Sequence, residues 1–305
     1  MKLNKILFFG NERLATGLST TAPTLRALIA AGYDITGVVV AQKQIGKSRN
    51  ARDLEIVQVA TAHDIPVFSP DKLTDFADEL RAMQADAAVL AAYGKIVPQS
   101  IIDLFPRGII NIHPSMLPKH RGSIPIESVI LNGETETGVS IMQLVAKMDA
   151  GPVYKQQQVS VSKNVSKQVL ADQLQQLGAE LLIENLPAIL DGSLQPIPQD
   201  DSAATYDERI TKEQSQLDFS KTAEQLEREV RAYAVWPRSR TTLGAIECII
   251  TSAHVEPGEG TSGELWRDAQ QIGVYCSQDI LVVDTLLPAG KKEMPASSFI
   301  AGYQI

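Results

Sequence analysis

Residues 5–10 read KILFFG, a short apolar run that ends in a glycine. Such a run is typical of a fully buried β-strand, and the glycine at its end marks a turn. A helical pattern follows at 24–31, with Pro23 suited to its first turn and Gly32 to its end. The valine-rich residues 35–41 then predict a second strand. A strand, a helix and a further strand in this order predict a crossover between parallel strands.

The same alternation continues through the first two thirds of the chain. Further strands are expected at 65–68, 86–93, 109–113 and 138–145, and helices at 53–62, 71–83 and 165–190. The sequence therefore predicts an α/β fold with an open, mostly parallel, Rossmann-like sheet and helices on both faces. In such sheets ligands bind at the carboxyl ends of the strands, which is where Gly94 and His113 fall.

The last third of the chain has a different pattern. A helix is expected at 222–234, followed by short strands at 239–243, 247–251, 273–276 and 280–287. Short alternating strands separated by glycine and proline predict a small, OB-like β-barrel. The sequence thus divides into a catalytic domain at 1–195, a polar linker at 196–205 and a C-terminal β-barrel domain at 206–305.

The composition of the 305-residue chain is that of an ordinary globular protein, with 44% hydrophobic and 21% charged residues. Its two cysteines have no metal-ligand spacing and fit a reducing compartment. The apolar run at 6–9 is too short for a signal peptide or a membrane span, so we expect a cytoplasmic protein. The net charge of −8 gives no sign of the basic surface with which proteins bind nucleic acid.

The residues that indicate chemistry are concentrated at 111–122, NIHPSMLPKHRG. Asn111 and His113 are two residues apart on a predicted strand, so both side chains project from one face near its end. Asp149 follows the next strand and is placed to orient the imidazole of His113. The alternative is a buried Asn and His that only hydrogen-bond the following loop.

The pattern N-x-H-x-S-x-L-P-x-x-R-G resembles the hallmark of folate-dependent formyltransferases, and Asp149 is similar to that family's third catalytic residue. Residues 92–98, AYGKIVP, resemble the family's folate-pocket segment. In the last third, 206–212 and 231–237 resemble the start of the C-terminal domain of members that act on methionyl-tRNA, and 287–294 its end. The resemblance therefore spans nearly the whole chain, with its segments in the right order.

The resemblance implies a protein that transfers the formyl group of 10-formyltetrahydrofolate to the free amino group of methionyl-initiator-tRNA, for translation initiation. It implies that Asn111 and His113 donate hydrogen bonds to the oxyanion of a tetrahedral intermediate, while Asp149 holds the tautomer of His113. It also implies a monomer that needs no metal and binds no membrane. The folate contacts that it implies are Tyr93, Gly94, Ser115, Met116, Leu117 and Pro118.

The acceptor has an alternative, a nucleotide-linked amino sugar, because formyltransferases of that class carry a similar C-terminal domain. A loop at 42–52 with four basic and no acidic residues favours tRNA, since such side chains bind phosphates. Its alternative is a solvated surface loop, and the alternative for Arg121 is a structural role in its own loop. The expected substrate and tRNA contacts are Lys43, Lys47, Arg49, Arg52 and Arg121.

Two other classes of protein fit the sequence less well. A nicotinamide dehydrogenase needs a glycine-rich turn after the first strand, and Gly10 stands there without further glycines. A non-catalytic RNA-binding module would have no use for Asn111, His113 and Asp149 together. Acidic side chains also outnumber basic ones at 206–305, which is unusual for a module whose only role is to bind RNA.

Overall fold

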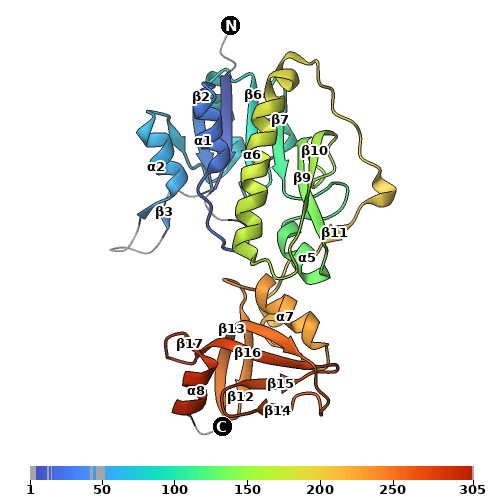
Figure 1. Cartoon of the computed structure of the whole chain (residues 1–305). Helices are drawn as coiled ribbons and strands as arrows, with labels where there is room; N and C mark the ends of the chain where they lie inside the picture. Colours follow the sequence, from blue (N-terminus) through green and yellow to red (C-terminus); the bar gives the residue numbers. More distant parts are fainter. Residues whose placement is uncertain (1–4, 12–13, 15, 42–43, 46–51, 304–305) are drawn as a thin grey trace. The chain divides into compact units, whose positions relative to one another are not determined.

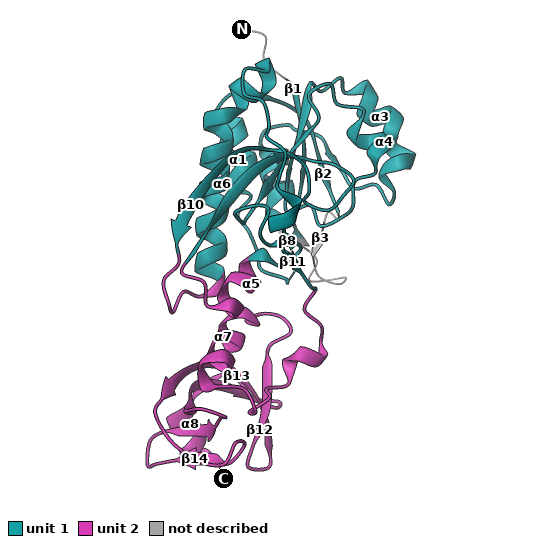
Figure 2. Cartoon of the chain, turned by 90° about the vertical axis from the view of Figure 1, so that its right-hand side faces the viewer, with its two compact units in different colours: residues 1–125, 136–160, 168–208 teal, residues 126–135, 161–167, 209–305 magenta. Residues whose placement is uncertain are grey.

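The computed structural model describes residues 5–11, 14, 16–41, 44–45 and 52–303. Contacts between Cα atoms divide the chain into two compact units, shown in Figure 2. The first unit comprises residues 1–125, 136–160 and 168–208, and the second comprises residues 126–135, 161–167 and 209–305. The second unit therefore includes two short segments from the middle of the chain.

The first unit is built on a seven-stranded sheet with the strand order β10-β9-β7-β6-β1-β2-β5 (Figure 1). Its strands are β1 (Lys5–Gly10), β2 (Asp34–Val40), β5 (Val67–Phe68), β6 (Ala87–Ala91), β7 (Ile109–His113), β9 (Glu136–Gln143) and β10 (Val153–Ser160). Neighbours from β7 to β5 pair in parallel, whereas β9 and β10 pair antiparallel. The predicted open, mostly parallel sheet is thereby confirmed.

Helices cover both faces of this sheet. They are α1 (Pro23–Ala30), α2 (Glu55–Ala62) and α6 (Lys167–Asp191) on one face, and the short η2 (Leu73–Phe76), α3 (Ala77–Ala82) and α4 (Gln99–Ile102) on the other. Ile6 and Phe8 of β1 pack with the first set, while Leu7 and Phe9 pack with the second. Successive side chains of a strand point to opposite faces, so one apolar strand contributes to two cores.

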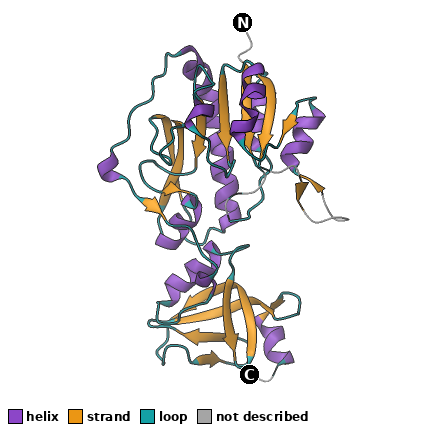
Figure 3. Ribbon diagram, turned by 180° about the vertical axis from the view of Figure 1, so that it is seen from behind, coloured by secondary structure: helices purple, strands orange, loops and turns teal. Residues whose placement is uncertain are grey.

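The second unit contains α7 (Ala223–Ala232), α8 (Ala296–Gly302) and an antiparallel sheet that curls into a half-barrel (Figure 3). The strands are β12 (Ser239–Leu243), β13 (Ile246–Glu256), β14 (Leu265–Arg267), β15 (Ile272–Tyr275), β16 (Ile280–Pro288) and β17 (Met294–Pro295). The register of β13 against β16 shifts on both sides of Ser252, and such bulges bend a sheet. Leu226 of α7 and Phe299 of α8 are buried in its core.

Two pairs of short strands connect segments outside these sheets. β3 (Gln44–Ile45) pairs with β4 (Arg52–Asp53), and β8 (Arg121–Gly122) pairs in parallel with β11 (Tyr206–Asp207). The second pair brings the residues just after the predicted linker beside the hallmark loop. α5 (Pro125–Asn132) follows β8 directly. Across the described part of the chain, we find no helix long and apolar enough to cross a membrane.

Candidate active site

Asn111 and His113 lie near the carboxyl end of β7, as the sequence predicts. Ile110 packs in the core formed with α6, and Ile112 packs against that core. Because side chains alternate along a strand, Asn111 and His113 point to the opposite face of the sheet. Both are buried, with exposed fractions of 6% and 5%. A buried carboxamide and imidazole on one face form a compact set of hydrogen-bonding groups.

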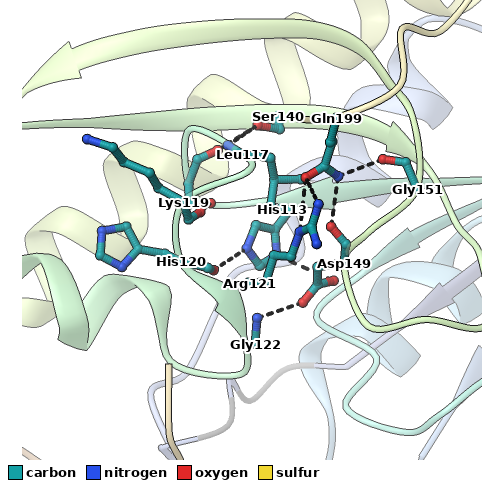
Figure 4. A network of polar contacts seen from close by, with 11 residues as sticks. His113, Leu117, Lys119, His120, Arg121, Gly122, Ser140, Asp149, Gly151 and Gln199 are labelled. Carbon is teal, nitrogen blue, oxygen red and sulfur yellow. Dashed lines mark hydrogen bonds and ion pairs between the residues drawn. The ribbon is translucent and has the colours of Figure 1, made fainter. Parts of the chain in front are cut away.

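The surroundings of His113 fix the state of its ring (Figure 4). Its Nε2 lies 2.9 Å from the backbone O of His120. A carbonyl oxygen only accepts hydrogen bonds, so Nε2 carries the proton. In the neutral ring, Nδ1 is then the nitrogen that accepts hydrogen bonds. Nδ1 faces Asp149 and lies 3.7 Å from its Oδ1.

The Asp149 carboxylate is held by the hallmark loop. Its Oδ2 accepts a hydrogen bond from the backbone N of Gly122 at 2.9 Å, while Oδ1 faces His113. Gly122 has a φ of 128°, and a Cβ there would lie 3.0 Å from the backbone O of Asp207. The glycine of the hallmark is therefore needed where the chain passes close to β11.

Arg121 is completely buried and binds residues that the sequence did not single out. Its Nε and Nη2 donate to Oε1 of Gln199, its Nη1 donates to the hydroxyl of Tyr206 at 2.8 Å, and its Nη2 lies 2.7 Å from Oδ1 of Asp201. Burial lowers the pKa of Arg121, but the hydrogen bonds to Asp201 and Tyr206 outweigh that effect and raise it. This arrangement favours the structural alternative for Arg121, and its contact with substrate stays a prediction.

The turn at 115–118 is anchored by its own hydroxyl and by neighbouring strands. Ser115 Oγ donates to the backbone O of Lys119 at 2.7 Å, and Ser140 Oγ of β9 donates to the backbone O of Ser115 at 2.6 Å. Gln156 Nε2 of β10 donates to the backbone O of Leu117 at 2.8 Å. The buried Ser115 hydroxyl is thus used within the turn, while Met116 and Pro118 are partly exposed, and their contact with folate stays a prediction.

Tyr93 and Gly94 follow β6 at a second part of the site. Tyr93 is 1% exposed, and its hydroxyl has no hydrogen-bond partner among the described residues. Burial raises the pKa of Tyr93 to about 12, so this hydroxyl stays neutral and can donate or accept. Beside it lies a cavity of about 220 Å³, lined by Pro70, Asp71, Lys72, Leu73, Thr74, Tyr93, Lys95, Ile96 and Pro98. An unpaired buried hydroxyl next to a cavity with charged walls suits a polar organic ligand.

Most of the tRNA contacts expected in the basic loop cannot be placed in the structure. Lys43, Lys47 and Arg49 lie outside the described residues, and of Arg52 only the backbone in β4 is described. No group of three or more His, Cys, Asp or Glu side chains in the described ranges is placed to hold a metal ion.

The structure reveals positioning groups that no local sequence pattern indicates. The backbone O of His120 and the backbone N of Gly122 contact His113 and Asp149, but backbone groups leave no trace in residue type. Gln199 lies 50 residues after Asp149 in the sequence and contacts the backbone of its loop. A glutamine within a polar stretch gives no sign in the sequence that its side chain contacts this loop.

Comparison with known proteins places both halves of the chain in one family. Residues 6–186 match the formyl transferase family, and residues 209–304 match its C-terminal domain. A methionyl-tRNA formyltransferase of Staphylococcus epidermidis is 33% identical over 99% of this chain and 97% of its own length. A protein of the same name from Myxococcus xanthus is 34% identical over the whole of this chain and 97% of its own length.

A solved structure has a similar fold at lower identity. The N-formyltransferase of Helicobacter canadensis, in complex with folinic acid and dTDP-3-aminofucose, superposes with a TM-score of 0.69 and is 17% identical. The match covers 95% of this chain and all of that one. From the matches to both domains and the full-length relatives, we conclude that the chain belongs to the formyl transferase family.

Proposed function

We propose that this protein transfers the formyl group of 10-formyltetrahydrofolate to the free amino group of methionyl-initiator-tRNA. The product is N-formylmethionyl-tRNA, which serves translation initiation in the cytoplasm. The observation that carries the proposal is the full-length similarity, at 33% and 34% identity, to two proteins named methionyl-tRNA formyltransferase. That similarity extends over the C-terminal unit as well as the catalytic one.

The proposed reaction is an attack of the neutral amine on the formyl carbon. A carbon–nitrogen bond forms to the methionyl amine, and the bond from the formyl carbon to N10 of the folate breaks. The amine loses one proton, and N10 of the leaving tetrahydrofolate gains one. Asn111 donates a hydrogen bond to the developing oxyanion, a contact of a kind worth about 3 kcal/mol in a water-excluded site.

His113 and Asp149 supply charge and proton transfer in this proposal. Nδ1 of His113 is the ring nitrogen that takes up a proton, and Asp149 Oδ1 at 3.7 Å stabilises the imidazolium that results. The positive charge of the imidazolium then stabilises the negative charge that develops on the oxyanion. This assigns Asn111, His113 and Asp149 to the reacting atoms and needs no metal.

The folate is proposed to lie between the turn at 115–118 and the segment at Tyr93 and Gly94. The unpaired Tyr93 hydroxyl supports this placement, and so does the cavity of about 220 Å³ beside it. Residues 1–195 are proposed to carry the catalysis, with 196–205 as the connection. Residues 206–305 then bind tRNA, and the enzyme acts as a monomer.

The alternative acceptor is a nucleotide-linked amino sugar. It is favoured by the fold likeness to the Helicobacter canadensis N-formyltransferase, whose structure contains dTDP-3-aminofucose. That protein is only 17% identical, about half the identity of the methionyl-tRNA formyltransferases above. The amino-sugar reaction is therefore the second candidate.

The decisive experiment offers 10-formyltetrahydrofolate together with charged initiator tRNA, glycinamide ribonucleotide or an amino-sugar nucleotide in parallel. We expect formylation of the charged tRNA alone. His113→Ala should abolish it while leaving the circular-dichroism spectrum unchanged. Formylation of the amino-sugar nucleotide alone would contradict the proposal and support the alternative acceptor. Near-normal turnover of His113→Ala would show that His113 has no role in the reaction.

A further inference from the structure

Gln199 lies in the segment predicted as a linker, yet its side chain is directed at the active site (Figure 4). Its Nε2 donates to the backbone O of Asp149 at 2.8 Å and to the backbone O of Gly151 at 2.6 Å. Both hydrogens of the carboxamide nitrogen are therefore used on the loop that carries the Asp149 carboxylate.

This loop needs to be held, because its backbone is strained. Asp149 has a φ of 47°, in the left-handed region that residues with a Cβ rarely adopt. Two residues later, a Cβ on Gly151 would lie 1.8 Å from the backbone O of Gln143, so the chain passes tightly against the end of β9. Such conformations persist only where surrounding contacts fix them.

Arg121 fixes which way the Gln199 carboxamide points. Its Nε and Nη2 lie 3.1 and 2.9 Å from Gln199 Oε1, and a guanidinium can only donate. The carbonyls of Asp149 and Gly151 can only accept, so the nitrogen of Gln199 has to face them. Arg121 is itself held by Tyr206 and by Asp201. The orientation of Gln199 is thus determined chemically from both ends.

The same segment also holds the partner of the second catalytic side chain. The backbone O of His120 accepts a hydrogen bond from His113 Nε2. His120 is itself held by two contacts with this segment. Thr205 Oγ1 accepts from the backbone N of His120 at 2.8 Å, and Asp207 Oδ1 lies 3.1 Å from His120 Nδ1. Residues 199–207 therefore contact both the Asp149 loop and the loop that orients His113.

We infer that Gln199 is a positioning residue for formyl transfer, which acts by holding the Asp149 loop in the conformation that presents its carboxylate to His113. The inference rests on the proposed function. It assigns the segment at 199–207 to the active site as well as to the connection between the two parts of the chain. Arg121 acts in the same way, through the orientation of Gln199.

The test is Gln199→Glu, which has nearly the same shape. A glutamate still accepts from Arg121, but it cannot donate to the two carbonyls and places negative charge against them. We expect kcat to fall about 10- to 100-fold, since a small misplacement of a catalytic group has an effect of this size. The KM for 10-formyltetrahydrofolate should change less than about twofold. Gln195→Glu, the same change at an exposed position four residues earlier, should keep wild-type kcat.

A double-mutant cycle separates positioning from a general effect on folding. Single-turnover formylation rates are measured for Gln199→Glu in the wild-type and in the Asp149→Asn background. If Gln199 acts through Asp149, its substitution should cost less than about threefold once that carboxylate is absent. An equal loss in both backgrounds would overturn the inference, as would wild-type kcat for Gln199→Glu.

A replacement variant and the choice of acceptor keep the result of the cycle interpretable. If Gln199→Glu does not fold, Gln199→Met replaces it, because methionine has a similar length and neither donates to the carbonyls nor repels them. The cycle is run with whichever acceptor the wild-type enzyme formylates. A wild-type enzyme that formylates none of the acceptors contradicts the proposed function, whereas additive losses in an active enzyme contradict only the role of Gln199.

Discussion

At the scale of single residues, the site depends on which atom of each group faces which partner. His113 donates from Nε2 to a backbone carbonyl, and its other nitrogen faces Asp149 Oδ1. Asp149 in turn uses Oδ2 on the backbone N of Gly122. One oxygen of this carboxylate therefore holds the loop and the other faces the imidazole, so a substitution can be chosen that affects the two contacts unequally.

Asp149→Asn should lower kcat by about 10²- to 10⁴-fold, the range lost when a proton-transfer group is removed. Asparagine tolerates the left-handed backbone and keeps an oxygen for Gly122, so the loop should survive. Dissociation constants for a non-reactive folate should stay within about threefold of wild type. Fluorescence titration measures the binding and a formylation assay measures kcat; a matching loss in both would make Asp149 a structural residue.

The sequence indicates the three side chains that we propose to react, but not the residues that hold them. Asn111, His113 and Asp149 are recognised by residue type and spacing within a motif. Gln199 and Thr205 act through tertiary contacts, across gaps that no periodicity describes. Ser115 is a third case: the resemblance implies a folate contact there, and its hydroxyl donates within the turn.

At the scale of elements, the apolar strands of the first sheet and its longer helices were predictable, whereas α5, α8 and the polar edge of the sheet were not. β10 was missed because Lys155 and the three glutamines after it lack the alternation of a half-buried strand. Within the sheet it is paired with β9 and forms one edge, where polar side chains are favoured. The predicted helix at 71–83 is divided into η2 and α3.

The contact of α6 with β7 leads to a prediction on Gly178. A Cβ there would lie 2.6 Å from Cγ2 of Ile112 and 3.2 Å from Cγ1 of Val139. Gly178→Ala should therefore destabilise the protein, because overpacking costs about 1–3 kcal/mol and outweighs the gain in helix propensity of about 1 kcal/mol. The measurement is the midpoint of thermal unfolding. Gly302→Ala in α8, where an added Cβ would meet no described atom outside its own helix within 4 Å, should leave the midpoint unchanged or raise it. A higher midpoint for Gly178→Ala would contradict the close packing.

The pairing of β13 with β16 leads to a prediction on pH. His254 Nδ1 lies 2.7 Å from Asp284 Oδ1, and His254 Nε2 lies 3.3 Å from Glu256 Oε1. Partial burial lowers the pKa of His254, but the hydrogen bonds to Asp284 and Glu256 outweigh this and raise it above its usual 6.5. A raised pKa stabilises the fold below the unfolded value, and that stabilisation is lost as the pH rises through the folded one.

His254→Gln should therefore remove part of the difference in stability between about pH 6 and about pH 9. The second unit of the wild type should unfold at a lower temperature at the higher pH, while the variant should respond less. Thermal unfolding followed by circular dichroism at both pH values measures this. His63→Gln, at an exposed position after α2, should behave like the wild type. An unchanged pH response in His254→Gln would show that this cluster does not stabilise the fold.

At the scale of the whole molecule, charge limits how tRNA can be bound. The net charge is −8, so long-range attraction to a polyanion is unfavourable and binding has to rely on local basic groups. The basic loop at 42–52 is the candidate that the sequence offers.

Replacing Lys47 and Arg49 with Ala should raise the KM for tRNA and flatten its dependence on salt. The slope of log K against log salt concentration should fall by about 1–2, since each phosphate contact contributes a little under one unit. Replacing Arg81 and Lys155, which lie on other elements, removes the same charge and should leave the slope unchanged. Equal slopes for both double variants and the wild type would exclude the loop as a phosphate contact.

The second unit is assembled from segments that lie far apart in the sequence, and this constrains the order in which a growing chain can fold. Residues 126–135 and 161–167 are synthesised well before 209–305, to which they belong. Arg231 of α7, for example, donates to the backbone O of Val165, 66 positions earlier. These two segments cannot form their contacts with residues 209–305 until the last third of the chain has left the ribosome. A C-terminal fragment expressed from residue 206 lacks both segments, and it would leave the guanidinium of Arg231 without this carbonyl.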